Sequence, residues 1–135
     1  MRFKLDEKAF PPERAHPKDA GLDLRSPIST WIEPNSHKMI DTGVHAEIPA
    51  GFVGLLTSKS GLMLKGIVSS GTIDSGYTGS IGAVLYNHSN EGYHVSRGDK
   101  ITQLVVFPIS LAKVELVEEL EETERGDSGF GSTGK

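Results

Sequence analysis

The chain has 135 residues, enough for one domain with a modest core but too few for two. It contains no cysteine, which excludes disulfides, thiolate zinc sites and cysteine nucleophiles, and its net charge of −4 argues against a general nucleic-acid binder. No apolar run approaches the roughly 18 residues of a membrane span, so we expect a cytoplasmic protein that contacts neither membrane nor nucleic acid.

The expected elements, taken in chain order, are short and rich in β-forming residues. Two prolines oppose regular structure in the first segment, 2–14. Strands are predicted over 37–49, 51–59 and 80–89, and one or two more over 93–110. In 112–120 a strand competes with a helix, and we favour the strand. Short β-rich runs at this spacing, with sixteen glycines, predict an all-β sandwich or barrel-like domain.

One short helix is predicted over 60–66, with Ser60 as its N-cap and Gly66 at its end. The free N–H groups at the start of such a helix favour phosphate as a ligand. The simpler interpretation, an ordinary capped turn, is the more common outcome for this pattern alone.

The stretch "GTIDSGYTG" (71–79) predicts a β-hairpin that carries a carboxylate and an aromatic ring. Asp74 is a candidate general base acting on water, and Tyr77 could wall a sugar pocket. The stretch taken alone slightly favours the simpler interpretation, a turn aspartate and a half-buried strand tyrosine.

The C-terminal segment 125–135 combines four glycines with groups suited to a nucleotide. Arg125 offers a bidentate fork for phosphate, Ser132 and Thr133 offer hydroxyl donors, and Phe130 offers a flat face for a base. It is not a P-loop, because Ser132 stands where the lysine belongs. We therefore expect a domain over 1–124 and a flexible glycine-rich lid over 125–135, with a frayed terminus as the alternative.

Five stretches in order resemble the five motifs of the homotrimeric dUTPase family, the dUTP diphosphatases. They are "AGLDL" (20–24), "SKSGL" (58–62), "GTIDSGYTG" (71–79), "GDKITQL" (98–104) and "RGDSGFGSTG" (125–134). The resemblance implies a distorted jelly-roll of the β-clip type with one short helix. It also implies a homotrimer with sites between subunits, in which the C-terminal arm of one subunit closes a site formed by its neighbours.

The activity that the resemblance implies is hydrolysis of dUTP to dUMP and pyrophosphate, which limits uracil in DNA and supplies dUMP for dTMP synthesis. Asp74 would activate a water against the α-phosphorus, and Gln103 would contact phosphate or that water. Tyr77 would pack under the deoxyribose and exclude a 2′-hydroxyl. The hairpin backbone around Thr72 and Ile73 would read the uracil edge.

The remaining implied contacts involve the phosphates and the metal. Lys59, Ser60 and Gly61 would hold phosphates at the start of the helix. The terminal segment would grip the γ-phosphate and stack on uracil through Arg125, Phe130, Gly131, Ser132 and Thr133. Mg²⁺ would be bound through substrate phosphates and water, with no direct protein ligand and indirect support from Asp23.

The sequence departs from the family pattern at the second motif, which commonly reads Pro-Arg-Ser. Ser58 and Lys59 stand in the first two places here, so a bidentate fork becomes a point charge. Two other functions stay open: a dCTP deaminase-like enzyme of the same fold, and a nucleotide-responsive interaction protein.

Overall fold

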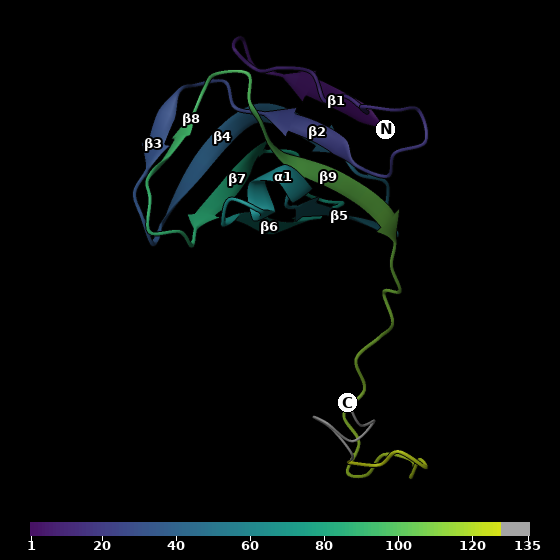
Figure 1. Cartoon of the computed structure of the whole chain (residues 1–135). Coiled ribbons are helices and arrows are strands. Elements are labelled where there is room, and N and C mark those ends of the chain that lie inside the picture. Colours follow the sequence, from purple (N-terminus) through teal and green to yellow (C-terminus); the bar gives the residue numbers. More distant parts are fainter. Residues whose placement is uncertain (128–135) are drawn as a thin grey trace.

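The computed structural model describes residues 1–127, which form a curled antiparallel β structure with one helical turn (Figure 1). The elements are β1 (Arg2–Leu5), β2 (Leu22–Arg25), β3 (Thr30–Ile32), β4 (Ser36–Glu47), β5 (Phe52–Thr57), α1 (Ser60–Met63), β6 (Ile67–Asp74), β7 (Ser80–Asn87), β8 (Tyr93–Val95) and β9 (Lys100–Pro108).

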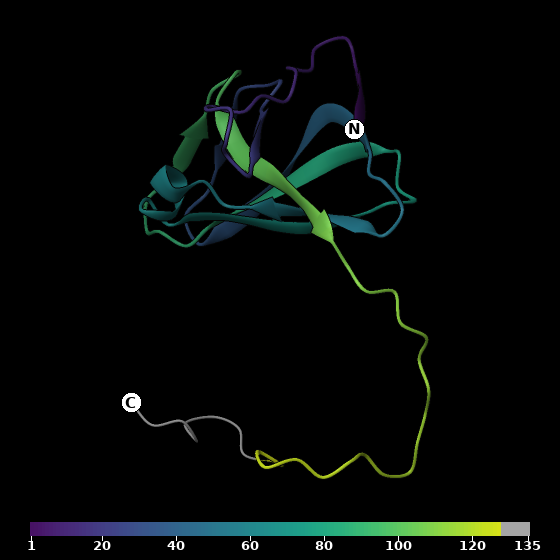
Figure 2. The ribbon, with the colours of Figure 1, turned by 90° about the vertical axis from the view of Figure 1, so that its right-hand side faces the viewer.

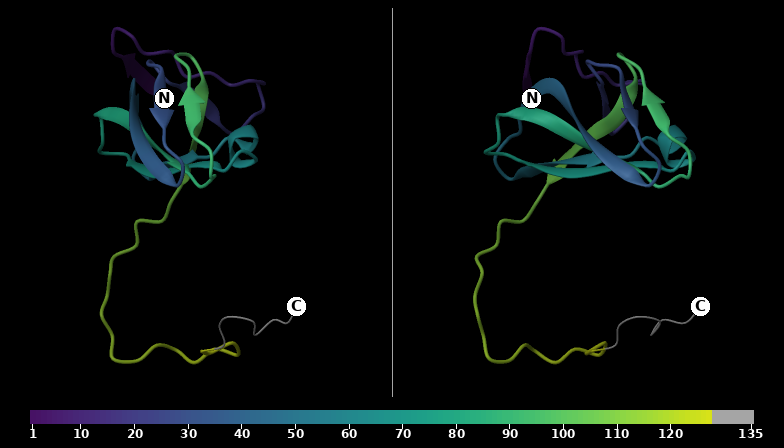
Figure 3. Two further views of the ribbon diagram at one scale, coloured as in Figure 1. Left: turned by 60° about the vertical axis from the view of Figure 1, so that its left-hand side comes forward. Right: turned by 90° about the vertical axis from the view of Figure 1, so that its left-hand side faces the viewer.

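Seven strands form one sheet in the order β1-β4-β7-β6-β5-β9-β2, and β3 pairs with β8 separately. The sheet curls so that β1 and β2, at its two edges, come to the same side of the molecule (Figure 1). The expected all-β class is confirmed, and the curled arrangement is that of a jelly-roll. Figure 3 shows the pair β3 and β8 closing one side of the curl.

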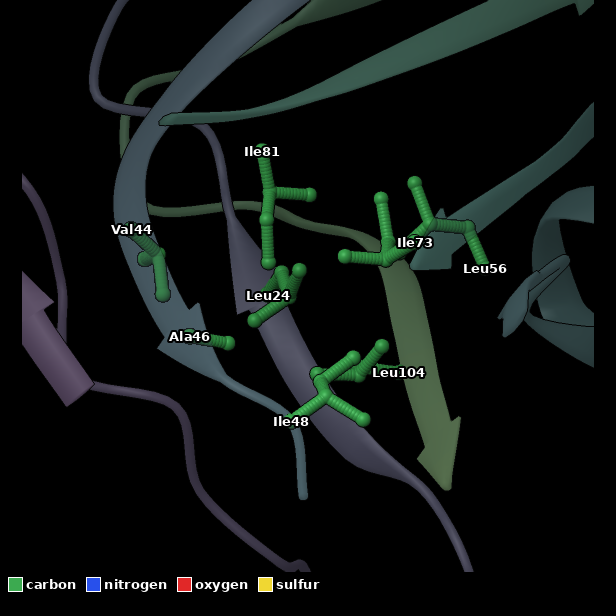
Figure 4. Packing of buried hydrophobic residues seen from close by; sticks show 8 residues of the cluster. All are labelled: Leu24, Val44, Ala46, Ile48, Leu56, Ile73, Ile81 and Leu104. Atoms are coloured by element: carbon green, nitrogen blue, oxygen red, sulfur yellow. The ribbon is translucent and has the colours of Figure 1, made fainter. Parts of the chain in front are cut away.

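The interior is filled by two clusters of aliphatic side chains. One contains residues contributed by β2, β4, β5, β6, β7 and β9, which point toward one another in Figure 4. The other is built around Ile40, Ile67, Leu85 and Ile101. Because strands separated in sequence supply each cluster, the core fixes how the sheet curls.

The chain reverses between β6 and β7 as predicted, but the two strands pair with each other only outside the predicted stretch 71–79. β6 and β7 pair at Ile67–Asn87, Val68–Tyr86 and Ser69–Leu85. Beyond this point β6 pairs with β5, whereas β7 pairs with β4. We call residues 67–87 the open hairpin, since its arms 70–74 and 80–84 each keep one edge that is not laddered to the other arm.

The helix prediction needs correction at both ends. α1 covers Ser60–Met63 only, and Lys59, with extended φ and ψ of −76° and 131°, holds the N-cap position. Ser60 is the first helical residue, and no side-chain cap bond is found in the part of the chain described. The chain reverses at Gly66, whose φ is +76°.

Several segments differ from the sequence expectation, since β2 and β3 are strands that the sequence did not predict. Arg2–Leu5 forms β1 because it pairs with β4 before the prolines are reached. The strand expected over 112–120 is wrong for the single chain. Beyond β9 the chain runs away from the body as an exposed arm, 109–127 (Figures 1 and 2). An extended segment becomes a strand only where another edge pairs with it, and residues 1–127 supply none.

Candidate functional site

Side chains of alternating charge meet where β2 lies beside β9. Lys59 and Lys100 each place an ammonium against the carboxylate of Asp23, and the Lys100 Nζ to Asp23 Oδ2 distance is 2.7 Å. Glu13 Oε1 accepts from Arg25 at 2.9 Å and lies 3.3 Å from the Lys100 ammonium. We call these five residues the charged cluster.

Asp23 is the buried centre of this cluster, with 3 % of its surface exposed. Burial by itself raises the pKa of its carboxyl, but the adjacent ammonium groups of Lys100 and Lys59 outweigh burial and hold that pKa below its usual range. The pKa of Lys100 is raised by the same contact. Asp23 is therefore a carboxylate whose negative charge is already matched by two cations.

Gln103 lies next to the charged cluster because three strands are in register there. It is opposite Asp23 on β2 and opposite Thr57 on β5. Its Nε2 donates to the Ser58 carbonyl at 3.3 Å. A Cβ on Gly21 would lie 2.2 Å from the Gln103 Oε1, so only glycine leaves room for this amide.

A hollow of about 270 Å³ opens beside these groups. Its lining includes Gly21, Asp23, Lys59 and Gln103. Ser60 and Gly61 follow directly, and the first N–H groups of a helix have no partner within the helix. The Lys59 ammonium and the Gln103 amide in the lining, with the helix N-terminus next along the chain, suit an anion such as phosphate.

A second group of predicted residues lies on the open hairpin. Thr72 and Asp74 are exposed at the end of β6, while Ile73 between them turns inward to the core. Tyr77 lies in the connecting loop with 45 % of its surface exposed. Its hydroxyl donates to the Ser80 carbonyl at 2.7 Å, and its ring covers Gly79, where a Cβ would meet the phenol oxygen at 2.5 Å.

The two groups are not brought together within one chain. Along β5, Thr57 pairs with Ser70 of β6 whereas Val53 pairs with Asp74. Four residues of strand separate these positions, which is about 13 Å. Asp74 and Lys59 thus belong to opposite ends of β5.

The third group of predicted residues belongs to the C-terminal segment. Arg125 lies in the exposed arm, whose 120–127 portion is remote from the body in all views (Figures 1, 2 and 3). Phe130, Gly131, Ser132 and Thr133 lie outside the described residues.

Sequence reasoning did not find three members of the charged cluster: Glu13, Arg25 and Lys100. Lys100 stands within the stretch "GDKITQL", but nothing in the local pattern shows that it reaches Asp23. The bulge between Leu24 and Arg25 determines how Lys100 approaches Asp23. Such a shift in register is a property of the paired strands, not of either strand alone.

Comparisons with known proteins identify the family. The family model described as dUTPase matches residues 7–134. The chain belongs to the dUTPase family. A dUTPase of Clostridium tetani, named deoxyuridine 5'-triphosphate nucleotidohydrolase, is 44 % identical over 97 % of this chain and 93 % of that one.

Solved dUTPase structures agree with the fold. The dUTPase of Staphylococcus bacteriophage 80alpha with dUPNHPP has a TM-score of 0.93 and 35 % identity, and covers 99 % of this chain and 98 % of that one. A mutant of the dUTPase from phage phi11 of S. aureus is described with a structural Mg(II) ion. It has a TM-score of 0.82 and 35 % identity, over 90 % of this chain and 98 % of that one.

Proposed function

We propose that the protein hydrolyses dUTP to dUMP and pyrophosphate. The observation that carries this proposal is the family match over residues 7–134, which includes the open hairpin with Asp74 and Tyr77. Hydrolysis of this substrate removes a precursor of uracil in DNA and yields the substrate for dTMP synthesis.

The base is recognised by the backbone of the open hairpin. Arms 70–74 and 80–84 keep N–H and C=O groups that are not laddered to each other. Backbone groups around Thr72 and Ile73 can therefore pair with the edge of uracil in a fixed register. Ile73 and Ile81, one from each arm, anchor the hairpin in the same core cluster (Figure 4).

Tyr77 excludes ribonucleotides by packing under the deoxyribose. Its hydroxyl bond to the Ser80 carbonyl and its contact with Gly79 fix the ring before substrate arrives. A fixed ring leaves no room for a 2′-hydroxyl, whereas a mobile one would move aside.

The chemical step is the attack of water on the α-phosphorus. Asp74 accepts a proton from the water as its oxygen bonds to phosphorus, and the bond from the α-phosphorus to the bridging oxygen breaks. The electron pair leaves with pyrophosphate. Asp74 is exposed at the end of β6, so water reaches it directly.

The phosphates lie against the other group of residues. Lys59 supplies positive charge, Ser60 and Gly61 supply N–H groups, and Gln103 contacts phosphate or the attacking water. Because the chain belongs to the dUTPase family, whose resemblance implies a homotrimer, we infer a site between copies of the chain. The C-terminal arm of a further copy closes it through Arg125, Phe130, Gly131, Ser132 and Thr133.

Mg²⁺ fits this arrangement as an ion carried by the substrate. No set of three His, Asp or Glu side chains suited to a metal occurs in residues 1–127. Asp23 is matched by two lysines, so it supports the phosphate region indirectly through Lys59. When bound, Mg²⁺ neutralises charge on the triphosphate and leaves the protein to orient it.

The compartment proposed is the cytoplasm. Within the described part of the chain, no helix has the length and apolarity needed to cross a bilayer.

The test of the function is pyrophosphate release from each of the eight common nucleoside triphosphates, by the wild type and by Asp74→Asn. We expect the wild type to prefer dUTP, and the variant to bind dUTP yet lose turnover by at least about 10³-fold, because asparagine cannot accept the proton. Turnover by Asp74→Asn at the original rate would remove Asp74 as the base.

The same assay, with ammonia release and nucleotide binding also measured, distinguishes dUTP hydrolysis from the two alternative functions. Ammonia released from dCTP would identify a deaminase. Tight binding of dUTP without release of pyrophosphate or ammonia would identify a nucleotide-responsive interaction protein.

A further inference from the structure

The strand β4 is irregular beside the open hairpin. Its pairing with β7 steps from Asp41–Gly82 to His45–Ser80, so three residues of β4 lie between these pairs but only one residue of β7. Gly43, at the centre of this bulge, has a φ of +67°. A Cβ there would also lie 2.9 Å from Ala9 Cβ, so glycine is required on both counts.

Where the backbone pairing between β4 and β7 is interrupted, side chains make hydrogen bonds between the two segments. Thr42 Oγ1 donates to the Ile81 carbonyl at 2.7 Å, and the Ser80 hydroxyl donates to the Asp41 carboxylate. His45 Nδ1 lies 2.8 Å from the Thr78 carbonyl, which can only accept, so Nδ1 carries the hydrogen. All three contacts hold the end of the hairpin from which Tyr77 projects.

His45 is held from its other side as well. Its Nε2 lies 3.2 Å from Asp6 Oδ1, and the Asp6 N–H donates to the Gly43 carbonyl at 2.9 Å. The ring is mostly buried, with 18 % of the side chain exposed. The Nδ1–H bond to the Thr78 carbonyl directs the ring at the loop, and Nε2 donates to Asp6 only when the ring carries both hydrogens, since a carboxylate oxygen accepts.

The contact between His45 and Thr78 affects the neighbouring ring of Tyr77, which faces the sugar in the proposed site. Tyr77 precedes Thr78 and donates its hydroxyl to the Ser80 carbonyl, and Ser80 is the residue paired with His45. Loss of the His45 bond would leave the loop 75–79 attached through Ser80 while freeing the carbonyl next to Tyr77. The ring would then have more than one position.

We propose that His45 is a positioning residue that sets the discrimination between deoxyribose and ribose by fixing the loop 75–79 under Tyr77. The proposal rests on the proposed function, because the substrate is dUTP. His45 touches no reacting atom in this scheme, and it acts through Thr78 and Tyr77.

The experiment compares His45→Ala with His45→Asn, whose amide N–H can replace Nδ1–H toward the Thr78 carbonyl. His88→Ala is the matched control, since His88 follows the opposite end of β7. For each protein, kcat/KM is measured with dUTP and with UTP. Backbone hydrogen exchange of residues 75–80 is followed without nucleotide.

We expect the dUTP-to-UTP ratio of kcat/KM to fall about tenfold in His45→Ala and to be largely restored in His45→Asn. Exchange over 75–80 should be faster in His45→Ala only. An unchanged ratio, or equal losses on dUTP and UTP, would overturn the proposal while leaving dUTP hydrolysis by the wild type intact.

If the wild type hydrolyses no dUTP, the proposed function fails by itself. The exchange data then decide whether His45 fixes the loop: faster exchange in His45→Ala supports that role, and unchanged exchange overturns it.

Discussion

At the scale of single residues, the sequence identified residues within motifs but not the contacts that form between distant segments. Asp74 and Tyr77 could be singled out because the residue types of their stretch suggest chemistry, whereas Gln103 was identified only through the resemblance to the dUTPase family. The contacts of Asp23 could not be foreseen, since Lys59 reaches it from the N-cap of α1 and Lys100 from β9. Charge pairing across a sheet depends on register, and register is settled only when the strands meet.

The buried carboxylate of Asp23 makes acid sensitivity predictable. Its pKa is lowered in the folded chain, so its contribution to stability is fully present above the unfolded-state pKa of about 3.9. That contribution is lost as the pH falls through the lower folded-state pKa. We expect the free energy of unfolding, measured by urea denaturation, to decrease below about pH 4.

The variant Asp23→Asn isolates this contribution. It removes the carboxylate that Lys59 and Lys100 share, while Lys100 keeps its contact with Glu13, and we expect a loss of about 2–4 kcal/mol at pH 7, because both lysines stay partly hydrated. The difference in unfolding free energy between wild type and variant should shrink in acid. A difference independent of pH would mean that the ion pairs are not its cause.

At the scale of elements, the local pattern predicted strands in which apolar residues repeat. It did not predict segments that become strands, or stay irregular, according to whether another strand pairs with them. The segments 37–49, 51–59 and 80–89 were found because apolar residues repeat in them, and they correspond to β4, β5 and β7. β1 was missed because its charged residues give no such pattern, yet pairing with β4 orders it. The expected strand over 112–120 had the pattern but lacked the partner.

The turn that ends α1 offers a test at the same scale. Gly66 has a φ of +76°, and an added Cβ would lie 3.3 Å from the Ser89 backbone nitrogen. We expect Gly66→Ala to lower the free energy of unfolding by about 1–2 kcal/mol, because L-residues are strained in that conformation.

Gly61→Ala is the matched control for this turn. A Cβ at Gly61 meets nothing within 4 Å, and alanine favours a helix, so we expect its stability to be equal to or above that of the wild type. Thermal unfolding of both variants decides the matter. Equal losses at the two positions would contradict the role given to the left-handed conformation of Gly66.

At the scale of the whole molecule, the exposed arm is the feature that bears on the proposed homotrimer. Val114 and Leu116 are 90 % and 94 % exposed, and Leu120 is 85 % exposed. Apolar side chains in a row on an extended segment are costly in water and suit the edge of a second copy. The alternation first interpreted as a strand is what such an exchange would use.

Association is therefore expected to depend on these side chains. By sedimentation equilibrium the wild type should have about three times the 14.5 kDa mass of one chain. Val114→Asp with Leu116→Asp should shift the population toward single chains, because buried unpaired carboxylates oppose docking. Glu115→Gln, between them, serves as the control, and a trimer unaffected by the double change would exclude the arm from the interface.

Removal of residues 125–135 tests the lid separately from assembly. The described arm is joined to the body through the Ile109 N–H and the Gly51 carbonyl, well before the deletion. We expect an unchanged melting temperature and a loss of kcat/KM for dUTP of at least about 100-fold, since the closing groups are lost. Full activity in the shortened protein would eliminate the lid from the mechanism.

The separated arms of the open hairpin have a consequence for how selectivity can change over evolution. Main-chain amides and carbonyls are common to all residues other than proline, so exchanging side chains along 70–74 or 80–84 alters the surroundings of these groups and leaves the groups themselves in place. A different nucleobase would demand that one arm slide or change its length. Selection for a new pyrimidine should accordingly recover insertions and deletions in this stretch more readily than point substitutions.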